Sequence, residues 1–486
     1  MASLQHLSPQ PLWHWFEQIC SIPHPSKHEQ QLIEHIKAWV ETQPKVTLKQ
    51  DATGNLILSK PATPGMEDRK GVVLQAHLDM VPQKNNDKDH DFVTDPIETL
   101  IDGEWLTANG TTLGADNGIG MASALAVLQS DDIEHGPLEV LLTVDEEAGM
   151  TGAFGLQSDS LNGEILINTD SEQEGEIYMG CAGGIDASLR LPVSYQAAES
   201  QTAFQLTVKG LKGGHSGCDI HLGRGNANKL LGRFLFAAPA ELQLALAAIQ
   251  GGSLRNAIPR EGQAQFTIAS DKVDALNAYV AEFTAIVTKE LSVAEPNLTI
   301  ELNGIDAPAE VMQSASQQTL VNTLHACPNG VVRMSDAIEG VVETSLNLGV
   351  VTVAEGTATI LCLIRSLDDS SRNNVETTLA ALAQLAGAEV SFTGAYPGWK
   401  PDNSSPVMAL VRDLYQELFQ REPDIMVIHA GLECGLFKKP YPEMDMVSIG
   451  PTIKFPHSPD EKVHIESVAQ YWQLLTQLLK AIPAKD

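Results

Sequence analysis

The chain has 486 residues, and its 43% hydrophobic and 19% charged content is typical of a globular protein rather than a disordered one. This length exceeds what one hydrophobic core ordinarily supports, so we expect at least two domains. The 62 acidic and 31 basic residues give a formal charge of −31, which argues against nucleic acid and anionic membrane as partners.

Terminal and cysteine patterns predict a cytoplasmic protein. The first residues hold no basic segment followed by an apolar run, so the sequence predicts no secretory signal. No apolar run reaches the length of a membrane span. The six cysteines form no CxxC pair, which favours free thiols over disulfides or a thiolate zinc site. They are Cys20, Cys181, Cys218, Cys327, Cys362 and Cys434.

The first predicted elements are a helix and a buried strand. The segment 26–29 has the spacing of a capping box, and apolar residues at helical period follow it. Residues 72–74 form a short apolar run that predicts a buried strand, and this run leads to His77 and Asp79. Residues two apart on an extended segment face the same way, so an imidazole and a carboxylate would leave the strand side by side. A solvated polar pair after a core strand is the alternative.

A glycine-rich turn and two further strands follow. The turn at 110–120 feeds a predicted helix and places Asp116 at its start, where a plain helix cap is the alternative role. The lysine of a phosphate-binding loop is absent from this turn. The predicted strand 138–144 ends at Glu146 and Glu147, and the predicted strand 164–169 ends at Asp170. Three such strand ends predict an α/β sheet with a site at the carboxyl ends of its strands.

The pattern of apolar and polar residues changes after residue 185. Alternating apolar residues near 204–208 and 264–268, a hairpin over 343–363, and helices near 226–236, 273–291 and 375–385 predict an inserted α+β domain. We place this domain at 186–394, between the two parts of a catalytic domain at 1–185 and 395–486. The last part contains short predicted strands at 425–428 and 446–449. His457 follows the second of these, within a turn.

Two imidazoles and three carboxylates are gathered from these segments as candidate metal ligands. They are His77, Asp116, Glu147, Asp170 and His457. Nitrogen and oxygen ligands suit zinc, cobalt or manganese. Without cations, carboxylates about 4 Å apart would repel by about 4 kcal/mol per pair at an effective dielectric constant of about 20. Two divalent ions would offset this repulsion and acidify a water, and Glu146 is the candidate to accept its proton. An acidic turn residue is the alternative for Glu146.

These segments resemble a known family, the co-catalytic metallopeptidases of the M20 clan. Within that clan the resemblance is to bacterial dipeptidases that act on aminoacyl-histidine, and it covers essentially the whole chain in the same order. It implies an α/β fold, in which a mixed-sheet zinc-peptidase catalytic domain carries an inserted α+β lid domain. The matching motifs are AHLDMVP, TLGADNGIGMA, VDEEAGMTGAFGL, NTDSEQEGEIYMGCAGG, KGLKGGHSG, LRNAIPRE, HAGLECGLF and PHSPDE.

The resemblance implies two Zn²⁺ per chain, with Co²⁺ or Mn²⁺ as substitutes. It assigns His77 and Asp170 to one ion, Glu147 and His457 to the other, and Asp116 to both. It also implies that Asp79 orients His77 and that Glu146 is the general base.

The lid residues receive roles from the same resemblance. His215 would stabilise the oxyanion of the tetrahedral intermediate, and Asn256 and Gly431 would contact the substrate. Arg365 would bind the terminal carboxylate of the substrate, with Arg255 and Arg333 as rivals. Whether His215 serves its own chain or the partner in a homodimer stays open.

The activity that the resemblance implies is hydrolysis of unblocked dipeptides, including Xaa-His and β-alanyl-histidine (carnosine). A metal-dependent deacylase of N-acyl amino acids is the alternative of the same fold. A non-catalytic, metal-bearing peptide-binding protein would lack the base or the bridging ligand, yet Glu146 and Asp116 are both present. We expect His429 and His464 to be structural.

Overall fold

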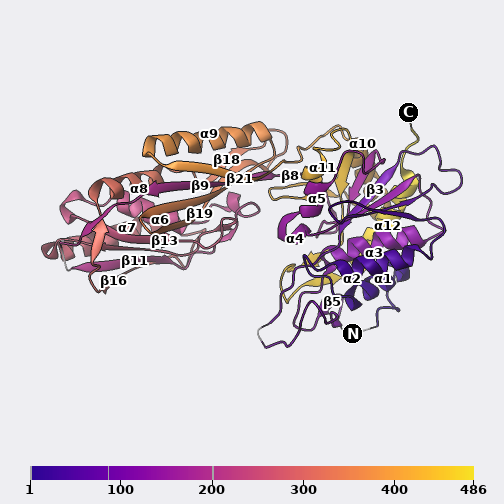
Figure 1. Cartoon of the computed structure of the whole chain (residues 1–486), viewed down its shortest axis with the longest axis horizontal. Coiled ribbons are helices and arrows are strands. Elements are labelled where there is room, and N and C mark those ends of the chain that lie inside the picture. Colours follow the sequence, from indigo (N-terminus) through magenta and orange to yellow (C-terminus); the bar gives the residue numbers. More distant parts are fainter. Residues whose placement is uncertain (1–2, 86, 200–201, 486) are drawn as a thin grey trace. The chain divides into compact units, whose positions relative to one another are not determined.

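The computed structural model describes residues 3–85, 87–199 and 202–485, and the chain divides into two compact units (Figure 1). Unit 1 comprises Met1–Gly180, Trp399–Val427 and Leu432–Asp486. Unit 2 comprises Cys181–Gly398 together with the short segment Ile428–Gly431. That segment lies outside the range 186–394 that the sequence suggests for the inserted domain.

A mixed sheet is the centre of unit 1, with the strand order β1-β2-β6-β3-β7-β23-β8-β22. Strands β3, β6, β7 and β23 run parallel, and every residue of β3, β6 and β7 is buried. The strands of this sheet are β1 (Thr47–Gln50), β2 (Leu56–Lys60), β3 (Val72–His77), β6 (Leu138–Thr143), β7 (Ile165–Asn168), β8 (Glu176–Cys181), β22 (Asp424–Ile428) and β23 (Asp445–Ser448). The sequence-based expectation of an α/β sheet with adjacent buried strands is confirmed.

Helices and a smaller sheet complete unit 1. Helices α1, α3 and α12 share one hydrophobic core with the central strands, and α10 packs against β23 and α12. The helices are α1 (Gln10–Ser21), α2 (Gln30–Val40), α3 (Ala115–Gln129), α4 (Glu146–Gly149), α5 (Thr151–Gly155), α10 (Pro406–Phe419), α11 (Glu433–Phe437) and α12 (Ile465–Ala481). The smaller sheet has the order β24-β25-β5-β4, from β4 (Thr99–Asp102), β5 (Trp105–Ala108), β24 (Ile453–Lys454) and β25 (Lys462–His464).

The close approach of α3 to the end of β7 requires a glycine. A Cβ built on Gly120 would lie 2.3 Å from the hydroxyl oxygen and 2.7 Å from the carbonyl oxygen of Thr169. We therefore expect Gly120→Ala to lower the free energy of unfolding by about 3 kcal/mol, because the helix must move off the sheet. Denaturant unfolding measures this loss. Gly304→Ala, whose Cβ would meet nothing within 4 Å, is the control and should change stability by less than about 0.5 kcal/mol.

The capping box expected at 26–29 is wrong. Helix α2 begins at Gln30, and Glu29 makes no side-chain cap of its first turn. The Ser26 hydroxyl instead donates to Asp79 Oδ2 at 2.7 Å, and Glu29 Oε1 accepts from the main-chain N–H of Asp145 at 3.0 Å. These partners come from buried loops at the carboxyl end of the sheet, which the local spacing of residues 26–29 does not reveal.

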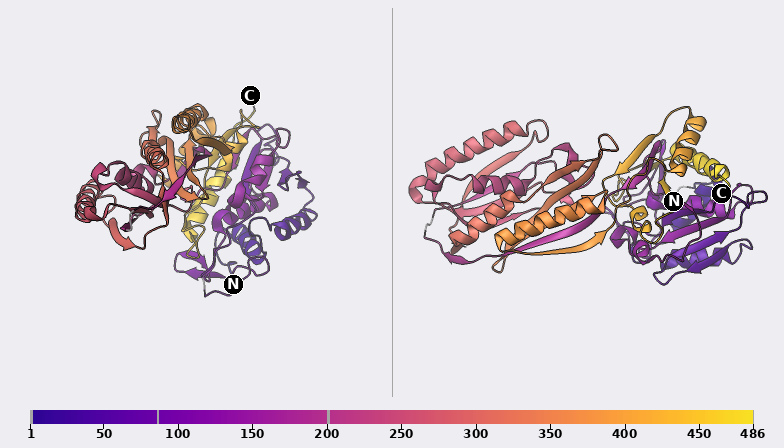
Figure 2. Two further views of the ribbon diagram at one scale, coloured as in Figure 1. Left: turned by 60° about the vertical axis from the view of Figure 1, so that its left-hand side comes forward. Right: turned by 90° about the horizontal axis from the view of Figure 1, so that it is seen from above.

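Unit 2 is an α+β body around a second sheet, with the order β16-β11-β15-β13-β19-β20-β9-β21 and β18 paired with β19. Its long helices run along the strands (Figure 2). The strands of this sheet are β9 (Gly183–Pro192), β11 (Ala203–Lys209), β13 (Ala245–Gly251), β15 (Gly262–Thr267), β16 (Thr299–Ile305), β18 (Gly330–Met334), β19 (Val342–Ala354), β20 (Thr357–Ser366) and β21 (Glu389–Tyr396). The helices are α6 (Ala227–Phe236), α7 (Val273–Glu290), α8 (Ser314–Ala326) and α9 (Asp369–Ala386).

Two short antiparallel pairs complete unit 2. One is formed by β10 (Tyr195–Ala197) and β17 (Glu310–Met312), the other by β12 (Gly214–His215) and β14 (Ala257–Ile258). The second pair brings the KGGHSG and NAIP motifs together. In the part of the chain that the structure describes, no helix is long and apolar enough to cross a bilayer.

Candidate metal centre

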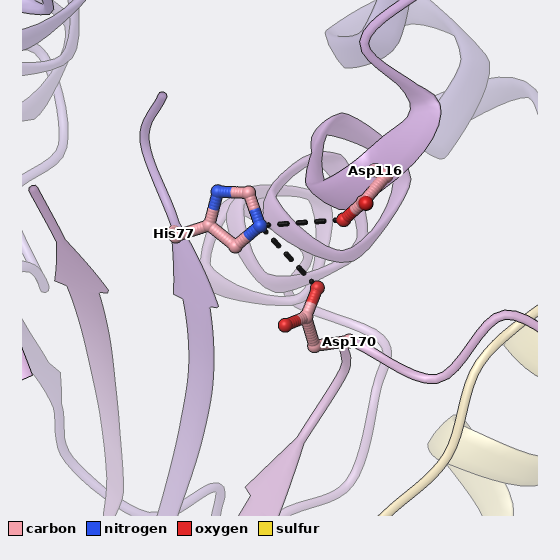
Figure 3. Close-up of side chains that lie close together, drawn as sticks. All are labelled: His77, Asp116 and Asp170. Atoms are coloured by element: carbon pink, nitrogen blue, oxygen red, sulfur yellow. Dashed lines mark hydrogen bonds and ion pairs between the residues drawn. The ribbon is translucent and has the colours of Figure 1, made fainter. Parts of the chain in front are cut away.

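Three predicted ligands converge at the carboxyl end of the central sheet (Figure 3). His77 is the last residue of β3, Asp170 follows β7, and Asp116 lies in the first turn of α3. His77 Nε2 lies 3.3 Å from Asp116 Oδ1 and 3.4 Å from Asp170 Oδ1. The imidazole is 1% exposed, and the side chains of Asp116 and Asp170 are 10% and 9% exposed, so the cluster is largely buried.

A main-chain contact fixes the tautomer of His77. Its Nδ1 lies 2.9 Å from the carbonyl oxygen of Asp79, which can only accept a hydrogen bond. Nδ1 therefore carries a proton and donates it, and the ring in its neutral form presents the Nε2 lone pair to the two carboxylates. This is the orientation that a metal-binding histidine needs.

A second cluster shares Asp116 with the first. His457 Nε2 lies 3.2 Å from Asp116 Oδ2 and 3.0 Å from Glu147 Oε2. Glu147 stands in the short helix α4 after β6, and His457 stands in the turn before β25. The His457 side chain is 52% exposed, whereas the Glu147 side chain is 7% exposed. The structure thus brings all five predicted ligands together within unit 1.

The donor set fits divalent cations. Oxygen and nitrogen ligands about 2.0–2.1 Å from a tetrahedral zinc lie about 3.3 Å from one another, and the separations in both clusters are close to this value. When the imidazole of a cluster is neutral, its Nε2 lone pair faces the lone pairs of the carboxylate oxygens. These like charges repel unless a cation or a proton lies between them. Glu147 Oε1 is also buried, and it has no hydrogen-bond partner among the residues that the structure describes.

The pKa values of the two imidazoles are raised by the negative charge of the neighbouring carboxylates. Burial alone would lower the pKa of His77, but the carboxylates of Asp170 and Asp116 raise it well above the usual value. Hydrogen bonding to Asp116 and Glu147 raises the pKa of His457 to about 11. Burial and the charge of Asp116 raise the pKa of Glu147 to about 7. A bound cation takes the place of such protons, since ligand groups bind metals in their deprotonated forms.

The Asp79 carboxylate contacts the turn of Glu146 and Glu147 as well as His77. Its Oδ1 lies 3.5 Å from His77 Nδ1, farther than its own carbonyl oxygen. The carboxylate accepts hydrogen bonds from the main-chain N–H groups of Glu146 at 2.9 Å and Glu147 at 3.2 Å. Burial would raise the pKa of this carboxyl, but His77, the Ser26 hydroxyl and the main-chain N–H of Glu146 lower it to about 2. Asp79 therefore fixes the turn that carries both glutamates.

Glu146 lies beside the ligands. One ligand atom each from His77, Glu146 and Glu147 falls within 4.8 Å of the others. Burial raises the pKa of Glu146 well above its usual range, and Asp170, Glu147 and Glu433 add to this effect, whereas His77 opposes it.

Glu433, on α11, was not predicted from the sequence. Its side chain is fully buried, and its Oε2 accepts hydrogen bonds from Gln75 Nε2 at 2.6 Å and Thr143 Oγ1 at 2.8 Å. Gln75 also accepts from Asn168 Nδ2 at 2.6 Å. A row of buried polar groups thus crosses β6, β3 and β7 beneath the ligands. The only signal in the sequence is an acidic residue inside the otherwise small and apolar segment HAGLECGLF.

Unit 2 holds a separate polar cluster around Arg365. This residue is 5% exposed and donates from Nε to Ser216 Oγ at 3.2 Å and from Nη1 to Tyr396 OH at 3.1 Å. Its Nη2 lies 3.3 Å from His215 Nε2. None of these contacts is a carboxylate, so this buried guanidinium is well placed to bind an anion. Tyr396 and Ser216 were not predicted.

The rival arginines are already paired. Arg255 is 52% exposed and forms a salt bridge with Asp186. Arg333 is equally exposed and forms salt bridges with Asp336 and Glu343. Neither has the buried, carboxylate-free surroundings of Arg365.

The main chain fixes the tautomer of His215 as well. The N–H groups of Gly217 and Cys218 donate to His215 Nδ1 at 3.2 and 3.1 Å. Burial and the charge of Arg365 lower the pKa of His215 to about 4, so the ring is neutral and carries its proton on Nε2. That N–H and Arg365 Nη2 are two donors side by side, which is an arrangement that suits an oxygen anion.

The remaining predicted residues lie near this cluster or serve as caps. Asn256 precedes the partner of His215 in the β12–β14 pair, and its carbonyl accepts from Ser216 N at 2.9 Å. Gly431 is the last residue of the segment Ile428–Gly431. The carbonyl oxygen of His429, in the same segment, would lie 1.9 Å from a Cβ built on Gly217. His429 Nε2 bonds to Ser345 Oγ at 2.8 Å. His464 Nδ1 accepts from Ser467 N at 3.3 Å and thereby caps α12.

Comparisons with known proteins show which proteins the chain is similar to. A cytosol non-specific dipeptidase of Escherichia coli (strain K12) is 60% identical over 486 residues, which is the full length of both chains. The solved structure of an aminoacylhistidine dipeptidase from Vibrio alginolyticus matches with a TM-score of 0.92 at 59% identity, covering 100% of this chain and 99% of that one. A tripeptidase from Staphylococcus aureus shares the fold, with a TM-score of 0.57 at 14% identity over 98% of this chain and 99% of that one.

The family model described as peptidase family M20/M25/M40 matches residues 73–481. This match covers all five candidate ligands and the whole of unit 2. By this match and by the full-length relative, the chain belongs to peptidase family M20/M25/M40, a family of peptide hydrolases.

Proposed function

We propose that the protein is a cytoplasmic dipeptidase that uses two divalent cations, zinc in the first place, to hydrolyse unblocked dipeptides, including Xaa-His and β-alanyl-histidine. The names of the two relatives near 60% identity support the dipeptide substrate, and one of them is named as cytosolic. The observation that supports the metal count is the sharing of Asp116 between two ligand clusters, each with one imidazole and a further carboxylate.

In this proposal the chain contributes five ligands. His77, Asp116 and Asp170 would hold one cation, and Asp116, Glu147 and His457 the other. When bound, the cations lower the pKa of an attacking water and polarise the carbonyl of the scissile peptide bond.

Glu146 is the proposed general base. Its carboxylate accepts a proton from the attacking water and then donates it to the nitrogen of the leaving amine, so the proton count is preserved. Asp79 keeps this carboxylate in place through the main-chain N–H of Glu146. The buried position of Glu146 beside the ligands supports this role.

The cluster around Arg365 in unit 2 is the proposed site for the negatively charged groups of the substrate. Arg365 would bind the free carboxylate of the dipeptide, and His215 Nε2–H would donate to the oxyanion that forms during attack. The neutral state of His215 supports a role as donor rather than as acid. Asn256 and Gly431 are proposed to contact the dipeptide backbone.

Replacing Arg365 tests the carboxylate site. We expect Arg365→Met to raise KM for free dipeptides roughly 10- to 150-fold, the equivalent of losing about 1.5–3 kcal/mol from a charge-assisted hydrogen bond. KM for the same dipeptides with an amidated carboxyl end should change little. Steady-state kinetics on the two substrate series measures both. Arg255→Met, which removes a guanidinium already paired with Asp186, is the matched control. An equal loss on free and amidated substrates would refute the assignment.

Substrate choice separates the dipeptidase from a deacylase of the same fold. We expect turnover of carnosine and of Xaa-His dipeptides, and little turnover of an N-acetylated amino acid. The reverse preference would favour the deacylase.

A further inference from the structure

The turn that carries Asp116 is held by a buried carboxylate from the other end of the chain. Glu461 is 2% exposed. Its Oε2 accepts from the main-chain N–H groups of Leu113 at 2.7 Å and Gly114 at 3.0 Å. Its Oε1 accepts from Ala115 N at 2.8 Å and Asp116 N at 3.3 Å. One carboxylate therefore satisfies four consecutive N–H groups.

These four groups need an outside partner. Helix α3 begins at Ala115, but Asp116 and Asn117 have non-helical dihedral angles, so the N–H groups of residues 113–116 lie before the regular helix and need acceptors from elsewhere in the fold. The residue before Ala115 is Gly114, which has no side chain to accept hydrogen bonds from this turn. Glu461 fills this role from a distance of more than 340 residues along the chain.

Glu461 also belongs to the turn that supplies His457. Its N–H donates to the carbonyl of Ser458 at 3.0 Å, and its carbonyl accepts from Thr107 Oγ1 at 2.8 Å. The side chain thus connects the turn of His457 to the turn of Asp116. The first turn supplies a ligand of one cluster, and the second supplies the ligand that both clusters share.

We propose that Glu461 is a positioning residue of the metal centre, which sets Asp116 and His457 at the separation that the cation they share requires. This inference rests on the metal centre of the proposed function. Groups that orient metal ligands typically change metal affinity by about 10- to 100-fold when they are removed.

Glu461→Gln is the informative substitution because the amide has nearly the same shape. Its oxygen can still accept from one pair of N–H groups, but its NH₂ faces the other pair, donor against donor. We expect Zn²⁺ affinity to fall about 10- to 100-fold, measured by competition with a chromophoric chelator. Activity at saturating Zn²⁺ should recover further than activity at limiting Zn²⁺.

Glu139→Gln is the matched control. Glu139 is a buried carboxylate of the same unit that accepts from Asn162 N at 2.8 Å, Gly163 N at 2.9 Å and Asn162 Nδ2 at 3.0 Å. It pairs in register with Val73, four residues before the ligand at the end of β3. We expect Glu139→Gln to lower the melting temperature and leave Zn²⁺ affinity unchanged.

The outcomes separate the inference from the proposed function. Weaker Zn²⁺ binding in Glu461→Gln, with normal binding in Glu139→Gln, supports the positioning role. Normal Zn²⁺ affinity in both variants overturns it and leaves the metal centre standing. Absence of Zn²⁺ binding by the unaltered chain overturns the metal centre and the inference together.

Hydrogen exchange on the unaltered chain keeps the inference testable should Glu461→Gln fail to fold. In the metal-free protein, the amides of residues 113–116 should exchange more slowly than those of exposed loops, because Glu461 holds them without help from a cation. Exchange as fast as in exposed loops would overturn the proposal.

Discussion

Glu146→Gln should lower kcat about 100- to 10,000-fold while the metal content stays at the level of the unaltered chain. The amide cannot accept a proton from water at neutral pH, and general base catalysis typically contributes this much to a rate. The substitution keeps the size of the side chain and the N–H that donates to Asp79 Oδ1. Because the base acts in the transition state, KM should change little.

The adjacent residue supplies the control for this prediction. Glu147→Gln stands one position along the same turn, and the Asp79 carboxylate holds its N–H too. We expect Glu147→Gln to lose bound metal as well as activity, since its Oε2 faces His457. Metal analysis with steady-state kinetics on both variants distinguishes base from ligand. Near-normal kcat in a fully metallated Glu146→Gln would show that the base lies elsewhere.

The metal ligands are the part of the site that a sequence describes best. Three of them follow apolar runs that form parallel strands, and Asp116 stands in a glycine-rich turn. Parallel strands bring their carboxyl ends to one edge of a sheet. His77, Glu147 and Asp170 could therefore be grouped before any coordinates were known. The residues that support the ligands were not predicted. Glu433 and Glu461 act on main-chain N–H groups and buried amides, and such partners leave no mark in the local sequence.

The predicted elements show the same limit. Helix α9 begins at Asp369, six residues before the predicted start, because Asp368 caps a polar first turn by accepting from Ser370 N and Ser371 N. Helix α8, which buries four of its thirteen residues, was not predicted. Strand β13 was missed because its alanines and glycine lack the bulk of a typical strand. The breadth of the apolar face does not explain every outcome, because α1 buries six of its twelve residues and was not predicted, whereas α9 buries three of its eighteen and was.

Removing the bound cations should abolish turnover, and restoring two equivalents of Zn²⁺, Co²⁺ or Mn²⁺ per chain should recover it. The reason is that lone pairs converge in each cluster. His77 Nε2 lies 3.3 and 3.4 Å from two carboxylates, and a bound cation would offset the negative charge that gathers there. Chelator treatment followed by titration with each metal measures both the loss and the stoichiometry.

Two substitutions then locate the cations. Asp116→Ala removes the ligand that both clusters share, so we expect it to bind neither cation tightly and to lose turnover with every metal. His457→Ala removes a ligand of one cluster only, and it should keep about one cation per chain on His77 and Asp170. Asp131→Ala, which removes an exposed carboxylate paired with Lys45, is the control and should bind two. Equal metal content in Asp116→Ala and Asp131→Ala would mean that Asp116 is no bridge, because a shared ligand cannot be lost without weakening both sites.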